Sequence, residues 1–328
     1  MNKNINTVVK LTTNCPGNCI CCTNRKKEIK IKNEGNKVFD ISVFKKVCED
    51  IRKIGATYIC FSGGEPTIIP NIRDYFEIAY ANDLAVRLNS NGWGITKENV
   101  KEWLSLGLEQ IVLSVYSLNE KTMKQSRGNN LIYSKSINAA KVIKEIKPEK
   151  GFNFIIQTVI MKDNYFELPK LLEFAIQNNA DYFWPSYLED AINLPVARMN
   201  KEDIILFKRN IIPEMKDIVD NNIIDLTLRE KLKHCIDKYY SDEYDGYIYH
   251  KDKFDCDWLG RHITLYPNGT VYPCPGHEYF SSECEDHLDY NSIDDYLKLD
   301  TLERNKQRKS THCAYCPQGV HQELKLYI

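Results

Sequence analysis

The sequence lacks the long apolar runs and the charge excess that mark several classes of protein. No window of about 18 apolar residues occurs, so no transmembrane helix is expected. The first residues have no apolar core of a secretory signal, which predicts a cytoplasmic chain. Lysine and arginine number 44 against 45 acidic residues, a net charge of −1. No electrostatic surface for nucleic acid or for an anionic membrane is therefore expected.

The sequence also contains no dinucleotide-binding glycine motif, no internal repeat and no low-complexity tract. It does contain six β-rich runs, each followed by an amphipathic segment. The expected strands are 6–13, 57–61, 84–92, 110–117, 151–161 and 180–190; the expected helices are 41–54, 71–82, 97–106, 132–146, 165–178 and one starting near residue 200. Six such units predict a parallel α/β fold. The pattern favours a partial (β/α)6 TIM-like barrel and is compatible with a doubly wound sheet. In both folds the active site lies at the carboxyl ends of the strands.

The character of the sequence changes after about residue 240. An aromatic, aperiodic stretch is followed by a strand, an Asn-Gly turn and a second strand over residues 261–274, which predicts a hairpin. A last helix is expected over about 292–308. We therefore predict two domains: the barrel over 1–245, and a small cysteine-rich β-hairpin and helix domain over 246–328.

The chain has twelve cysteines, four of them in the segment "CPGNCICC" that begins at Cys15. In a reducing cytosol, such density favours metal binding over disulfides. A zinc knuckle would need a second pair some 15 residues further on, but the next cysteine, Cys48, falls within a predicted helix. Cys15, Cys19 and Cys22 instead form a Cys-x3-Cys-x2-Cys motif. Three thiolates on a 4Fe–4S cluster leave one iron open, which suggests chemistry rather than electron transfer.

Further motifs follow the next strands in order: "FSGGEP" at 61–66, "LNSNGW" at 88–93, and "LSVYS" at 113–117 followed by an Arg-Gly pair. With the cysteine motif after the first strand, they resemble the radical S-adenosylmethionine (SAM) superfamily. The resemblance extends from residue 7 to about 190. It implies that Cys15, Cys19 and Cys22 hold a cluster. It also implies that the following residues contact SAM: Gly63, Gly64, Glu65, Asn91, Ser114 and Arg127.

One position departs from the family. The residue before the third cysteine is usually aromatic and lies against the adenine, but here it is Cys21. This leaves open an alternative ligand set of Cys15, Cys19 and Cys21. The x3-x2 spacing favours Cys22 as the ligand, with Cys21 beside the cofactor.

The resemblance implies a mechanism. SAM binds the open iron, the reduced cluster passes one electron to the sulfonium, and the resulting 5′-deoxyadenosyl radical abstracts hydrogen from a C–H bond. Such a reaction needs a reductant such as flavodoxin or ferredoxin. The protein's task is to aim one C–H bond at the radical and to exclude water and oxygen.

A second set of cysteines lies in the C-terminal region: Cys256, Cys274, Cys313 and Cys316. Taken alone, this set could be a zinc ribbon. After a radical SAM barrel it resembles the Twitch domain, the shorter form of the SPASM domain, which implies an auxiliary 4Fe–4S cluster. Cys284 could replace one ligand. Four thiolates imply a closed cluster that relays an electron. Relatives that mature sulfatases usually carry an Asp where Pro275 stands, so their reaction is not expected here.

The sixth expected strand ends in Tyr187, Glu189 and Asp190, which would point toward the barrel mouth. One of these carboxylates could act as a base during catalysis; the alternative is that they cap a solvated loop. Cys48 and Cys60 are expected to be buried as small hydrophobic residues.

Two classes of substrate fit the sequence. One is a ribosomally made peptide that is oxidatively matured; the other is a small aminosugar or nucleoside that is dehydrogenated or epimerised. Since only fourteen residues precede Cys15, a peptide-recognition protein is expected to be a separate partner. A non-catalytic iron–sulfur electron carrier is the third possibility. The open three-cysteine site argues against it.

Overall fold

The computed structural model describes residues 5–22, 38–186, 188, 196–223, 225–226, 229–230, 232–233, 236, 262–273 and 286–287. In this part of the chain, none of the helices combines the length and the apolar character needed to cross a bilayer.

Six parallel strands form the body of the sheet, in the spatial order β6-β5-β4-β3-β2-β1. They are β1 (Asn6–Thr12), β2 (Tyr58–Gly63), β3 (Ala85–Ser90), β4 (Leu108–Ser114), β5 (Asn153–Val159) and β6 (Tyr182–Ser186). Each strand pairs with the next one along the chain, which leaves β6 at the outer edge among the described strands. The open parallel sheet confirms the predicted α/β partial barrel.

Side chains alternate between the two faces of these strands. On β1 and β2, Val9 and Phe61 belong to the buried hydrophobic core beneath the helices. Their neighbours Lys10 and Ser62 line a cavity on the inner face. Because successive side chains of a strand point to opposite faces, each strand contributes to both the core and the cavity.

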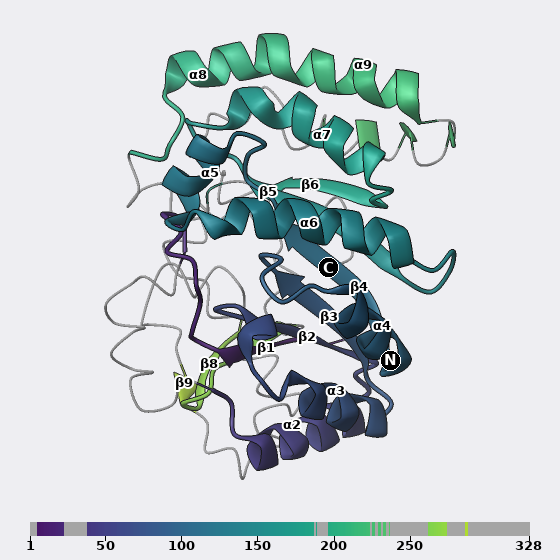
Figure 1. Ribbon diagram of the computed structural model, residues 1–328. Coiled ribbons are helices and arrows are strands. Elements are labelled where there is room, and N and C mark those ends of the chain that lie inside the picture. The colour runs from purple at the N-terminus through teal and green to yellow at the C-terminus, as the bar shows by residue number, and fades with distance from the viewer. Residues whose placement is uncertain are drawn as a thin grey trace.

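The helices follow the strands in alternation and cover the outer side of the sheet (Figure 1). They are α2 (Ile41–Lys53), α3 (Ile72–Ala81), α4 (Lys97–Ser105), α6 (Leu131–Ile146), α7 (Leu168–Gln177), α8 (Lys201–Leu206) and α9 (Ile212–Asn222), with a π-helical turn, η4 (Phe207–Ile211), joining the last two. Helix α2 packs beside α3, and α7 beside α9.

Helix α2 begins as the sequence predicts. Its N-cap Asp40 accepts hydrogen bonds from the backbone N–H groups of Ser42 and Val43, which satisfies two donors that have no partner within the helix. Its buried side includes Cys48, which is fully buried. Cys60 on β2 is 2% exposed. Both cysteines are therefore buried small side chains, as expected.

Helix α5 (Glu120–Arg127) is missing from the expected elements. Its sequence "EKTMKQSR" holds one apolar residue, Met123, and so gives no apolar periodicity to detect. Capping residues fix it instead: Asn119 accepts two backbone hydrogen bonds at its start, and Gly128 ends it in the left-handed conformation with φ of 68°. The helix places Arg127 at its last position.

A hairpin from late in the chain extends the sheet beyond β1. Strand β7 (His262–Leu265) pairs in parallel with β1, and β8 (Thr270–Tyr272) returns antiparallel to it, next to β9 (Asp286–His287). The amide nitrogen of Asn6 donates to Nδ1 of the buried His262 at 3.1 Å, so Nε2 of the ring donates to Thr264 at 2.9 Å. The hairpin predicted over 261–274 is confirmed. The proposed domain boundary near residue 245 lies outside the described residues.

Candidate functional site

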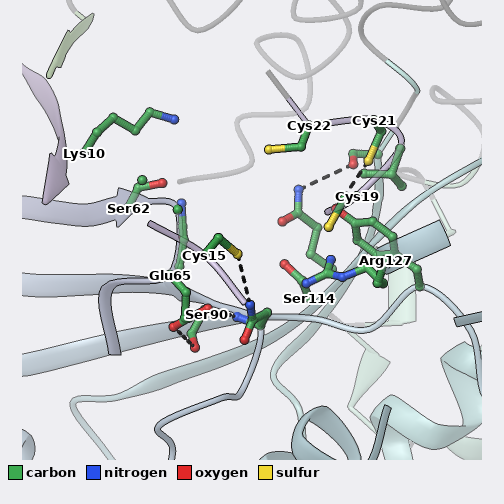
Figure 2. A pocket seen from close by; sticks show the side chains of 18 residues that line it. Lys10, Cys15, Cys19, Cys21, Cys22, Ser62, Glu65, Ser90, Ser114 and Arg127 are labelled. Carbon is green, nitrogen blue, oxygen red and sulfur yellow. Dashed lines mark hydrogen bonds between the residues drawn. The ribbon is translucent and has the colours of Figure 1, made fainter. Parts of the chain in front are cut away.

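A cavity of about 260 Å³ opens at the carboxyl ends of the parallel strands. Figure 2 shows its lining. Lys10 and Ser62 lie on one side, and Cys15 lies in the middle. The other side holds Cys19, Cys21, Cys22 and Arg127. The residues expected at the site that line it are Cys15, Cys19, Cys21, Cys22, Gly63, Gly64, Glu65, Asn91, Ser114 and Arg127. These residues come from five different segments, so the fold brings the sequence motifs together.

The cysteine loop, residues 13–22, is fixed by backbone contacts with the end of helix α5. The N–H of Asn18 donates to the carbonyl of Arg127 at 2.8 Å, and the N–H of Ile20 donates to the carbonyl of Ser126 at 3.0 Å. Gly128 lies so close that an added Cβ would be 2.9 Å from the Asn18 carbonyl oxygen. The helix that sequence periodicity misses therefore holds the loop in place.

The paired glycines after β2 support the base of the same loop. The N–H of Gly64 donates to the Thr12 carbonyl at 2.6 Å. A Cβ on Gly63 would lie 2.2 Å from the Thr12 carbonyl oxygen, and one on Gly64 would lie 2.0 Å from that of Asn14. Since real Cβ atoms do not approach backbone oxygens so closely, only glycine fits at either position. The two glycines therefore line the cavity and also allow the turn after β2 to contact the segment that leads from β1 into the cysteine loop.

Glu65 is 1% exposed and joins the loops after β2 and β3. Its carboxylate accepts four hydrogen bonds: from the backbone N–H and hydroxyl of Thr67 at 3.2 and 2.6 Å, from the hydroxyl of Ser90 at 2.8 Å and from the N–H of Asn91 at 2.6 Å. Burial raises the pKa of Glu65, and these four donors oppose the rise. The carboxylate is thus held rigidly at the cavity wall.

Asn91 continues this connection to the first cysteine. Its amide nitrogen lies 3.6 Å from Sγ of Cys15, and its amide oxygen accepts from the N–H of Trp93 at 3.0 Å. The N–H of Gly17 also points at Cys15 Sγ, at 3.3 Å. Burial raises the pKa of the Cys15 thiol to about 12. Donors around a sulfur stabilise its thiolate form, which is the form that binds metal.

Arg127, Tyr116 and Cys21 form a second group at the other end of the cavity. The Arg127 guanidinium lies 4.2 Å from the centre of the Tyr116 ring, and Sγ of Cys21 lies 3.8 Å from the Tyr116 hydroxyl. Burial raises the pKa of Cys21 to about 12. Burial lowers the pKa of Arg127, but the surrounding thiols and the phenol outweigh it and the net pKa is raised. The guanidinium is a buried, permanent cation whose Nε has no hydrogen-bond partner among the described residues.

Several predicted residues lie outside the described part of the chain. These are Tyr187, Glu189 and Asp190, which follow β6 in the sequence, and the second cysteine set Cys256, Cys274, Cys313 and Cys316, together with Cys284. Their roles stay predictions. In the part that is described, no three His, Cys, Asp or Glu side chains converge as a site for a single metal ion. A cubane cluster does not require such convergence, because each thiolate binds an iron of its own.

The cavity wall also contains residues that sequence reasoning missed: Lys10, Ser62, Asn89, Tyr116, Gln157 and Ser186. Each stands at or near the carboxyl end of a parallel strand. Position at a strand end is the signal that could have identified them. Ser62, Asn89 and Tyr116 lie within the quoted motifs, but the resemblance assigns them no role.

A partial barrel of parallel strands, with a Cys-x3-Cys-x2-Cys loop after the first strand, defines the class of enzymes that cleave SAM on an iron–sulfur cluster. The model of the Radical SAM superfamily matches residues 9–175, more than half of the 328 residues. The chain therefore belongs to the radical SAM superfamily.

Among its relatives, the chain is similar to a PqqA peptide cyclase of Bradyrhizobium diazoefficiens, with 23% identity over 287 residues that cover 87% of this chain and 69% of the relative. Among solved structures, SuiB of Streptococcus suis bound to the precursor peptide SuiA matches with a TM-score of 0.64 and 16% identity, over 98% of this chain and 71% of SuiB. The enzyme anSMEcpe with bound AdoMet and Cp18Cys peptide matches with a TM-score of 0.62 and 14% identity, over 95% and 85% of the two chains. At these identities the likeness to the solved structures shows the shared fold.

The residues of the cavity fit the cofactor that the family implies. Cys15, Cys19 and Cys22 line one space and offer the soft thiolate donors that iron–sulfur clusters take. The Nε of Arg127 is a buried donor without a partner in the described structure, which suits a carboxylate such as that of SAM. Both features are those of a site built to bind a group that the protein itself does not supply.

Proposed function

We propose that this chain reductively cleaves SAM and uses the 5′-deoxyadenosyl radical to abstract hydrogen from a C–H bond of a ribosomally made peptide, which is thereby oxidatively modified. The observation that carries the proposal is the common cavity of the cysteine loop, Glu65 and Arg127. The cluster and SAM, when bound, supply the radical. What the chain's own residues do can be derived from their contacts.

Cys15, Cys19 and Cys22 are proposed to hold the cluster, while the Asn91 amide and the Gly17 N–H stabilise the first thiolate. Gly63 and Gly64 are proposed to let the backbone approach the amino group of SAM, while Glu65, whose carboxylate already accepts four hydrogen bonds from the protein, keeps this turn in a fixed position at the wall. Arg127 is proposed to pair with a carboxylate, because its guanidinium is buried and charged at every pH the protein meets. Ser114 lies on the same wall as a donor for hydroxyl groups.

A peptide substrate is supported by the relatives. The curated relative is a PqqA peptide cyclase, and the matching solved structures include SuiB with its precursor peptide and anSMEcpe with a bound peptide. All of these proteins act on or bind peptides, according to their names. We therefore place peptide maturation ahead of the oxidation or epimerisation of a small metabolite.

The second cysteine set, Cys256, Cys274, Cys313 and Cys316, is proposed to hold an auxiliary 4Fe–4S cluster, whose chemistry would be electron relay. Flavodoxin or ferredoxin is proposed as the one-electron donor, and a peptide-recognition protein as a further partner. Tyr187, Glu189 and Asp190 are proposed at the substrate side, where a carboxylate could accept a proton.

Two measurements test the proposal. Anaerobic reconstitution is expected to give about eight irons per chain, four for each cluster. Incubation with SAM and dithionite is expected to release 5′-deoxyadenosine in amounts that depend on enzyme concentration. Four irons with one zinc would contradict the auxiliary cluster, whereas a reconstituted protein that releases no 5′-deoxyadenosine would contradict the catalytic proposal.

A further inference from the structure

The inner wall of the cavity carries polar side chains to which the family resemblance assigns no contact with SAM. Lys10 on β1, Ser62 on β2, Asn89 on β3, Gln157 on β5 and Ser186 on β6 all line it. Lys10 and Ser62 are direct partners in the parallel register of β1 and β2. The Gln157 amide donates to the Ser186 hydroxyl at 3.4 Å across β5 and β6. These five residues, here called the strand-end group, line the cavity beside the cysteine loop.

Within the strand-end group, Lys10 carries the only charge. Among the described residues, the other charged side chains that line the cavity, apart from the cysteines, are Glu65 and Arg127. The Glu65 carboxylate already accepts four hydrogen bonds from the protein, and Arg127 lies against Tyr116 beside the cysteine loop. Lys10 lies on the opposite side of the cavity from Arg127 (Figure 2). In the described part of the chain, the cavity therefore has one cation at the cofactor side, Arg127, and one at the strand-end side, Lys10.

The surroundings of Lys10 favour an anionic ligand. Its Nζ lies 5.9 Å from the centre of the Tyr266 ring, which belongs to the turn of the β7–β8 hairpin and is 1% exposed. The hydroxyl of Ser62 stands on the neighbouring strand in register with Lys10. An ammonium and a hydroxyl presented by neighbouring strands can hold the two oxygens of one carboxylate, and a partly buried ammonium attracts an anion more strongly than one in water.

We propose that Lys10, assisted by Ser62, binds a carboxylate of the peptide substrate and so selects which residue of the peptide reaches the radical. This inference rests on the proposed function, because it assigns a substrate contact to that same site. The carboxylate can be the side chain of an Asp or Glu next to the modified residue, or the C-terminus of the peptide. Both sources share the chemistry that Lys10 recognises.

The test uses the reconstituted protein with SAM bound and three small probes. N-acetyl-glutamate N-methylamide carries a side-chain carboxylate, N-acetyl-glutamine carries a terminal carboxylate, and N-acetyl-glutamine N-methylamide carries none. Dissociation constants are measured by ligand-observed NMR. At least one carboxylate probe is expected to bind about tenfold more tightly than the neutral probe, and the tighter of the two identifies the source.

Variants separate recognition from folding. Lys10→Met is expected to remove the preference for carboxylates, and Lys10→Arg to keep it. Lys10→Glu is expected to reverse it, so that N-acetyl-lysine N-methylamide becomes the preferred ligand. Lys141→Met, on the exposed face of α6, is the matched control and should bind like the wild type.

Equal affinity of the wild-type protein for charged and neutral probes would overturn the inference, as would an unchanged preference in Lys10→Glu. The release of 5′-deoxyadenosine by the wild-type protein is measured in parallel. If it is released while the carboxylate preference is absent, the inference about Lys10 fails and the proposed function stands. If none is released, the proposed function fails on its own measurement.

Discussion

The cysteine-loop side of the cavity is connected by hydrogen bonds between segments far apart in the sequence, whereas the strand-end side consists of side chains standing on neighbouring strands. On the first side, backbone contacts link the loop to α5 and to the turn after β2, and the Glu65 carboxylate joins two further loops. On the second side, the register of the parallel strands places Lys10 beside Ser62, and Gln157 donates to Ser186 on the neighbouring strand. The difference suggests that the cofactor side is preorganised for one ligand, while the other side can change with the substrate by single substitutions.

The largest expected effect comes from removing one proposed ligand. Cys22→Ala is expected to lose about four irons per chain and to reduce the release of 5′-deoxyadenosine to background, because two thiolates do not hold a cubane cluster. Cys21→Ala, one position away, is the matched control and is expected to keep its iron. The measurements are iron content after anaerobic reconstitution and product analysis. The opposite result would establish Cys15, Cys19 and Cys21 as the ligands.

An intermediate effect is expected from a substitution that adds a methyl group where the turn after β2 contacts the cysteine loop. Gly64→Ala places a Cβ 2.0 Å from the Asn14 carbonyl oxygen, and the backbone must move to accommodate it. We expect a loss of about 3 kcal/mol in the free energy of unfolding, measured with urea, together with weaker iron binding.

The control for this prediction is Gly151→Ala. Gly151 has a φ of 77° but no atom within 4 Å of an added Cβ, so the substitution strains the backbone without creating a clash. A cost of about 1 kcal/mol is expected there. Equal costs at the two positions would mean that the cysteine-loop side is not as tightly packed as the contacts indicate.

The smallest effect concerns the hairpin beside the strand-end side. Burial first, and then the charge of Lys10, lower the pKa of His262 to about 3, against an ordinary value of 6.5. Between these two pH values the unfolded chain binds a proton that the folded protein does not. The contribution of His262 to stability is therefore complete above pH 6.5 and is lost as the pH falls toward 3.

The slope of this loss is at most about 1.4 kcal/mol per pH unit for one proton. It is measured as the difference in the free energy of unfolding between the wild type and His262→Gln at pH 7, 6 and 5. The difference is expected to shrink as the pH falls. A difference that is constant over this range would show that the ring is not buried in its neutral form.

A feature could be predicted where its residues are contiguous in the sequence, and could not where contacts between distant segments determine it. The six strands and the cysteine, glycine and Asn-Gly motifs are contiguous in the sequence, so their order and their meeting at the strand ends could be predicted. Helix α5 could not, because caps and tertiary contacts rather than apolar periodicity fix it. Tyr116 and Lys10 could not either, since a single polar residue gains its meaning from the register of distant strands. Which cysteine binds iron, and what Arg127 contacts, stay predictions.

The pairing of β1 with β7 also determines the order in which the molecule can be completed. Asn6 and His262 are 256 positions apart, yet their strands are neighbours in the sheet. During synthesis from the N-terminus, β2 becomes available to β1 early, but the other edge of β1 has to wait for residues 262–265. For most of translation the strand that leads into the cysteine loop therefore has one open edge, to which other strands could add. Contacts of such long sequence separation form slowly, so the first segment of the site to be made is among the last to be enclosed.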